Sequence, residues 1–168
     1  MRDFLRRAMW LFVAILFVLT GVGVGIYYFW QATRGGNQNQ SQPQNQLKGQ
    51  PMPDFVPVAK VEGLQKIDKT VGSGTGAKAS STVAVIYTGA IASTGVVFES
   101  SQDSGQPVSF KLDQVIEGWK EGLVGMKVGG QRRLLIPASL AYGANPPPTS
   151  GIPPNADLVF DITLLAVQ

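Results

Sequence analysis

The apolar and polar positions divide the chain into stretches of different character. Residues 10–30 form a predominantly apolar run without a charged side chain, and residues 31–59 are rich in Gln, Asn, Gly and Pro. Residues 60–168 contain short segments in which apolar and polar positions interleave. The pattern predicts a membrane anchor over 10–30, a linker over 31–59 and one globular domain over 60–168.

The apolar run has the length and flanks of a transmembrane helix. At 1.5 Å per residue it matches a hydrocarbon core of about 30 Å. Trp10 lies at one end and Tyr27, Tyr28 and Trp30 at the other, where aromatic rings prefer the membrane interface. The competing interpretation is a cleaved signal peptide, whose apolar region is shorter and precedes a small-residue cleavage site. The aromatic end of this run favours the uncleaved anchor.

The flanking charges predict the orientation of this anchor. Arg2, Arg6 and Arg7 precede the run, whereas only Arg34 follows it closely. The positive-inside rule therefore places residues 1–9 in the cytoplasm as a short tail. The C-terminal domain is expected outside, in a periplasm or at the cell surface. Glycines at Gly-x-x-x-Gly spacing in the run hint weakly at self-association, but we expect a monomer.

The segment that follows is predicted to be a disordered tether. Within residues 31–59, the Gly-, Gln- and Asn-rich tract at 35–46 offers almost no apolar side chains from which a core could form. Pro51, Pro53 and Pro57 stiffen its last part.

The domain itself shows strand-like patterns. We expect an edge strand at 64–71, a central strand at 82–88 and further strands at 131–136 and 156–165. The last of these alternates apolar and more polar positions, so one face should be buried and the other, which includes Val159, exposed.

One helix is predicted, over residues 113–123. Asp113 is placed to cap it, and one face carries the apolar side chains of Val115, Ile116, Trp119 and Leu123. Several antiparallel strands and one short helix predict the α+β class.

Composition narrows the chemistry. The chain has neither cysteine nor histidine, which excludes thiol nucleophiles and His-based triads and leaves only carboxylates as likely metal ligands. We expect no metal and no cofactor. The net charge of +3 is modest and its basic residues are scattered, so nucleic acid is not an expected partner.

Six short motifs follow one another in the second half of the chain. They are Val-Ile-Tyr-Thr-Gly at 85–89, Phe-Glu-Ser-Ser at 98–101, Val-Ile-Glu-Gly-Trp at 115–119, Ala-Tyr-Gly at 141–143, Gly-Ile-Pro-Pro-Asn-Ala at 151–156 and Leu-Val-Phe-Asp-Ile at 158–162. In this order and spacing, residues 64–168 closely resemble the FK506-binding-protein (FKBP) family of peptidyl-prolyl cis-trans isomerases. The resemblance implies an antiparallel, half-wrapped β-sheet packed on one short α-helix.

The resemblance also implies a site. Its catalytic pocket would comprise Tyr87, Phe98, Glu99, Trp119, Tyr142 and Phe160, and its other substrate-binding residues would be Val108, Val115, Ile116 and Ile152. Trp119 would form the floor under the proline ring, and the Ile116 N–H and the Tyr142 hydroxyl would hold substrate carbonyls. Ile152 and the loop over 145–151 would form a flap.

Two positions depart from the family pattern. Glu99 stands where the family usually has Asp, and Val108 stands where it often has a pocket Phe, which should thin one wall. From periodicity alone, Trp119 is more simply interpreted as a core residue.

The resemblance implies a prolyl isomerase, and the predicted anchor and its orientation add the expectation that it assists the folding of exported proteins. Its partners would be proline-containing polypeptides, with FK506- or rapamycin-type macrolides as candidate ligands. The alternative is a non-catalytic chaperone module, tethered to the membrane, that only binds proline peptides.

Overall fold

The computed structural model of the protein describes residues 46–168. The predicted cytoplasmic tail, the anchor over 10–30 and most of the linker lie outside the described residues. Within the described part, no helix combines the length and the hydrophobicity that crossing a membrane requires.

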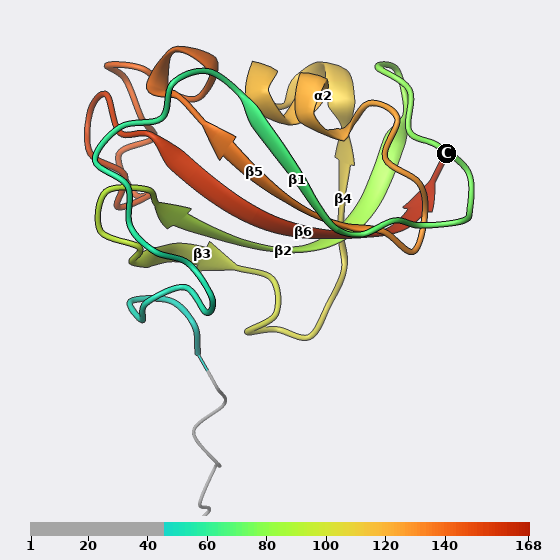
Figure 1. Ribbon diagram of the computed structural model, residues 1–168, viewed down its shortest axis with the longest axis horizontal. Coiled ribbons are helices and arrows are strands. Elements are labelled where there is room, and N and C mark those ends of the chain that lie inside the picture. Colours follow the sequence, from blue (N-terminus) through green and yellow to red (C-terminus); the bar gives the residue numbers. More distant parts are fainter. Residues whose placement is uncertain (1–45) are drawn as a thin grey trace, which may run out of the picture. The chain divides into compact units, whose positions relative to one another are not determined.

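A single antiparallel sheet forms the framework of the domain. Its strands are β1 (Gln65–Thr70), β2 (Thr82–Ile91), β3 (Val97–Ser100), β4 (Val108–Lys111), β5 (Gln131–Ile136) and β6 (Leu158–Val167). They are ordered β1-β5-β6-β2-β3, and β4 pairs with the other half of β2. The helix α2 (Glu117–Leu123) packs across one side of this sheet, together with the short 3-10 turns η1 (Leu112–Gln114) and η2 (Ala138–Leu140) (Figure 1). The predicted α+β class, with an antiparallel sheet packed on one short α-helix, is confirmed.

The strand predictions hold in outline. The segment at 131–136 is β5, and the predicted edge strand at 64–71 is β1, which lies at one end of the sheet. The central strand predicted at 82–88 runs on to Ile91, and the last strand is shifted by two residues. The short strands β3 and β4 were not predicted.

The prediction of one continuous helix over 113–123 is wrong. After η1 the backbone becomes extended at Val115 (φ −106°, ψ 173°), and α2 starts only after Ile116. Neither helical segment has a side-chain cap, and Asp113 instead pairs with Lys111 at 2.8 Å. β-branched side chains favour extended backbone, so two consecutive ones provide a natural place for this break.

The main core lies between α2 and the sheet. Leucine and isoleucine side chains of α2, β5 and β6 are fully buried there, and each contributes about 1.5–3 kcal/mol by leaving water. The helix approaches closely because a glycine faces the sheet: a Cβ at Gly118 would collide with the side chain of Ile136. This close approach sets the position of the neighbouring Trp119.

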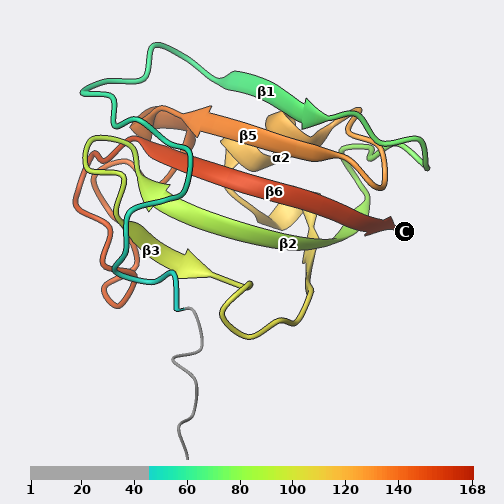
Figure 2. The ribbon, with the colours of Figure 1, turned by 60° about the horizontal axis from the view of Figure 1, so that its bottom comes forward.

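The linker prediction is wrong in its last part. Residues 47–61, here called the strap, pack on the domain and do not stay disordered up to residue 59. Met52 and Val61 are each only 3% exposed and join a second apolar cluster with Leu135 and Val159. The strap lies on the face of the sheet opposite α2 (Figure 2). Val159, predicted on the exposed face of the last strand, is therefore fully buried.

Candidate functional site

An open cavity of about 340 Å³ lies beside α2 and the sheet. Its lining comes from β2, β3, β4, η1, the two residues between η1 and α2, α2 itself, the segment after η2, and β6. The lining residues are Tyr87, Phe98, Glu99, Phe110, Gln114, Val115, Ile116, Trp119, Tyr142 and Phe160. This volume falls within the range of small-ligand sites.

Trp119 is the centre of the aromatic lining. Its ring centroid lies 5.3 Å from those of Tyr87, Phe110 and Phe160, at interplanar angles of 88°, 77° and 90°. Edge-to-face contacts of this kind add about 0.5–1.5 kcal/mol each beyond simple burial. The indole is only 4% exposed, and its Nε1 has no hydrogen-bond partner within residues 46–168. Three neighbouring rings thus hold the indole plane in a fixed orientation.

A glycine in β2 makes room for the other side of the cavity. The rings of Phe98 and Phe160 meet at 5.8 Å and 87°. A Cβ at Gly89 would lie 2.6 Å from the ring of Phe160 and 2.7 Å from that of Phe98. Both distances are far shorter than an ordinary carbon–carbon contact. The Tyr-Thr-Gly motif therefore ends in glycine because two aromatic side chains cross its backbone.

The polar groups of the lining are two phenols, an amide and one carboxylate. Burial raises the pKa of Tyr87, and the negative charge of Glu99 raises it further. Burial and the same carboxylate also raise the pKa of Tyr142, which is 36% exposed. Both hydroxyls therefore keep their protons at neutral pH and can donate hydrogen bonds.

Two predicted site residues do not line this cavity. Ile152 is buried in the main core and Val108 packs against that core from β4. The remaining eight are brought together around it, although they come from segments up to 73 residues apart (Tyr87 to Phe160).

Sequence reasoning missed Phe110 and Gln114. Phe110 lies two positions after Val108, on the same face of β4, and it supplies an aromatic wall against Trp119 and Tyr87. The family resemblance pointed to Val108, and because no strand was predicted here, no signal in the sequence pointed to Phe110.

Within residues 46–168, no cluster of three or more carboxylates could hold a metal ion. The cavity offers a ligand apolar surface, hydrogen-bond donors and one negative charge.

Comparison with known proteins identifies the family of this domain. Residues 74–165 match the model of the FKBP-type peptidyl-prolyl cis-trans isomerase domain. The chain belongs to the FKBP-type peptidyl-prolyl cis-trans isomerase family. The family predicted from the sequence is confirmed, and with it the enzyme class of the domain.

Individual relatives agree with this assignment. FK506-binding protein 4 of Aspergillus fumigatus is 42% identical over 128 residues, which is 75% of this chain and 25% of that protein. The isomerase FkpA of Escherichia coli is 50% identical over 97 residues, 58% of this chain and 35% of FkpA. A peptidyl-prolyl cis-trans isomerase crystal structure from Pseudomonas syringae pv. tomato superposes with a TM-score of 0.58 at 38% identity, covering 65% of this chain and 78% of that one. The chain thus spans about a quarter to a third of the curated relatives it matches.

Proposed function

We propose that this chain accelerates cis–trans isomerisation of peptide bonds that precede proline in polypeptide substrates. The observation that carries the proposal is the aromatic cavity built around Trp119, in a domain whose sequence belongs to a prolyl isomerase family. The proline ring would rest on the indole, between the rings of Tyr87 and Phe160.

The chemistry of the reaction suits such a cavity. Turning the bond costs about 18–20 kcal/mol because the planar amide is stabilised by resonance. The two ground states differ by only about 0.5–1 kcal/mol for X-Pro, so the catalyst need not drive the reaction in one direction. It has to bind the twisted amide more tightly than the planar one. The twisted amide has less charge separation than the planar one, so an apolar, partly dry site favours it.

The polar groups at the rim would orient the substrate. Within residues 46–168 no hydrogen bond is made by the N–H of Ile116, which lines the cavity at the residue before α2. This N–H and the protonated hydroxyl of Tyr142 are suited to hold substrate carbonyls on either side of the bond that turns. Glu99 would favour the protonated form of both phenols, because its negative charge adds to the effect of burial in raising their pKa values.

Exchange measurements on a short Leu-Pro peptide test this proposal. Magnetisation transfer between the cis and trans forms should speed up when the full chain in detergent is added. A Tyr142→Phe variant should slow turnover by removing one donor, while an FK506-type macrolide should compete for the cavity. A folded protein that binds the peptide without accelerating exchange would favour the alternative, a non-catalytic proline-binding module.

We also propose that the domain acts on exported proteins at a membrane. The supporting features are the uncharged apolar run at 10–30 and the arginines that precede it. Protease treatment of intact cells that carry an epitope tag after Gln168 tests the topology. Removal of the tag is expected, whereas protection in intact cells and loss only after lysis would place the domain in the cytoplasm.

A further inference from the structure

The strap lies before the residues that match the family model, and it pairs with the strand that carries part of the cavity wall. The match begins at residue 74, whereas the strap covers residues 47–61. The N–H of Gly49 donates to the carbonyl of Val97 at 2.8 Å, and the N–H of Val97 donates to the carbonyl of Gln50 at 2.9 Å. A further bridge pairs Pro51 with Val96. The strap thus adds an outer partner to β3.

We propose that the strap positions the β3 wall of the cavity and that Arg133, through the strap, is a positioning residue for prolyl isomerisation. The proposal rests on the proposed function. It assigns to residues 47–61 a part in substrate recognition although none of them lines the cavity.

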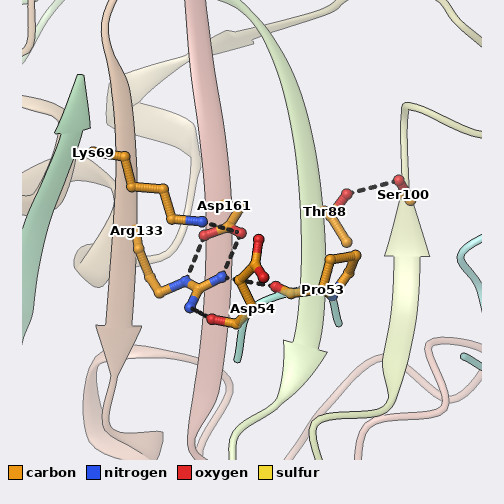
Figure 3. Close-up of polar contacts among 7 residues, drawn as sticks. All are labelled: Pro53, Asp54, Lys69, Thr88, Ser100, Arg133 and Asp161. Carbon is orange, nitrogen blue, oxygen red and sulfur yellow. Dashed lines mark hydrogen bonds and ion pairs between the residues drawn. The ribbon is translucent and has the colours of Figure 1, made fainter. Parts of the chain in front are cut away.

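The position of β3 depends on this outer partner. Within the sheet, β3 is a four-residue strand at the edge and pairs only with β2. A side-chain contact between Thr88 and Ser100, with hydroxyl oxygens 2.9 Å apart, ties its far end (Figure 3). Its near end is held from outside by the strap, where Val97 packs with Met52. Successive side chains of a strand point to opposite faces, so a shift of Val97 would carry Phe98 with it on the cavity side.

Arg133 joins the strap to the middle of the sheet. From β5 its guanidinium donates to the carbonyl oxygens of Asp54 (2.5 Å) and Pro53 (3.2 Å). The same group makes two 2.6 Å bonds to the carboxylate of Asp161 on β6 (Figure 3). Bidentate pairing with a carboxylate fixes the plane of the guanidinium, so its remaining donors are aimed at the strap. Its carbon also lies 5.3 Å from the centre of the Phe55 ring.

The strap is held in a conformation that a free chain would not favour. Asp54 has a φ of +53°, in the left-handed region, and it is the residue whose carbonyl accepts from Arg133. Two carboxylates fix the ends. Asp103 accepts from the N–H groups of Leu47 and Lys48 at 2.7 and 3.2 Å, and Asp157 accepts from that of Val61 at 2.8 Å. Loss of the central attachment should therefore loosen the middle of the strap while its ends stay bound.

An Arg133→Met variant of the full chain tests the proposal, with Lys69→Met as its matched control. Lys69 also pairs with Asp161, at 2.9 Å, but it has no hydrogen bond to the strap. We expect faster amide exchange at residues 49–55 and 97–99 in the Arg133 variant only. Its kcat/KM for a Leu-Pro peptide should fall about threefold to thirtyfold, mainly through KM. Circular dichroism of both variants establishes that they are folded.

A reversible cross-link separates positioning from general destabilisation. The chain has no cysteine, so a Pro51→Cys, Val96→Cys pair added to the Arg133 variant can form only one intramolecular disulfide. The paired positions are bridged across antiparallel backbone, at about 4.5–5.5 Å between Cα atoms, which a disulfide can span. Oxidation should restore KM and reduction should raise it again.

The outcomes distinguish this inference from the proposed function. If the parent protein did not accelerate exchange of the Leu-Pro peptide, the proposed function would be wrong. Amide exchange at 97–99 in the Arg133 variant would still decide whether the strap holds β3. Unchanged exchange at 97–99 after strap loosening, or unchanged KM in an active enzyme with a loosened strap, would overturn the inference.

Discussion

The rings of Trp119 and Phe160 meet at a right angle, with centroids 5.3 Å apart and an interplanar angle of 90°. Trp119 belongs to α2 and Phe160 to β6, so this contact joins the helix to the sheet at the base of the cavity. The tryptophan is therefore both a core residue and the floor of the proposed site, and the two interpretations of its place in the sequence are compatible.

Replacing this indole should remove activity beyond what lost stability explains. Trp119→Leu keeps an apolar side chain but loses three edge contacts, so the free energy of unfolding should fall by roughly 2–3 kcal/mol. Turnover of a Leu-Pro peptide should fall at least about tenfold, because the surface under the proline ring is lost. Leu164→Ala is the control, since it opens the same core without touching the cavity. Equal turnover in the two folded variants would contradict the assignment.

Gly89→Ala should disturb the crossing of Phe98 and Phe160. The added methyl would overlap both rings, and we expect a loss of about 1–3 kcal/mol in urea denaturation. Gly76→Ala serves as the comparison, because a Cβ there meets nothing within 4 Å and should change stability by less than about 0.5 kcal/mol. A neutral result at Gly89 would mean that the two rings can separate at little cost.

Glu99→Gln should lower the pKa of both phenols of the cavity. The carboxylate disfavours ionisation of Tyr87 and Tyr142, so a neutral amide removes one of the causes that raise their pKa values, although burial remains. In the parent, the raised pKa of Tyr87 stabilises the fold below pH of about 10, and this contribution is lost as pH rises through the folded-state value. Near-ultraviolet absorbance during alkaline titration measures the shift. Superimposable titrations of parent and variant would show that Glu99 lies too far away to act on the phenols.

Asp161 should make the domain sensitive to acid. Burial alone would raise the pKa of its carboxyl, but hydrogen bonds and charges from Arg133 and Lys69 outweigh burial and lower it. The stability gained is present above pH of about 4 and disappears as pH falls through the folded-state pKa. In Asp161→Asn, the free energy of unfolding should therefore depend less on pH below about pH 4. Near neutral pH the variant should lose roughly 2–3 kcal/mol of stability, because the buried guanidinium of Arg133 loses its carboxylate partner.

The comparison for Asp161 is Asp113→Asn. Asp113 forms an exposed pair with Lys111, so its loss should cost less than about 1 kcal/mol. If the free energy of unfolding fell equally steeply with decreasing pH in the parent and in Asp161→Asn, the Asp161 pair would not control acid unfolding.

The local pattern of the sequence determined much of this domain. Strand-like composition placed β5 at 131–136, and the polar side chains of 64–71 identified β1 as an edge strand, because a strand with one partner buries little. The six motifs indicated the family, and five of them contribute residues that line the cavity. Position 89 requires glycine because a Cβ there would collide with two aromatic rings. Position 119 carries tryptophan, whose ring packs edge-to-face against Phe160.

Contacts between distant segments decided the rest. Periodicity shows which side chains share a face but not what covers that face, so Val159 was expected at the surface until the strap was seen over it. Val108 was named from the family pattern, and only the fold shows that Phe110, two positions further along β4, lines the cavity instead. Residues 47–61 were largely predicted as linker because they follow a Gln/Asn-rich tract and carry three prolines among scattered apolar side chains. They are ordered because Asp103, Arg133 and Asp157, between 55 and 96 residues away in the chain, bind their backbone groups.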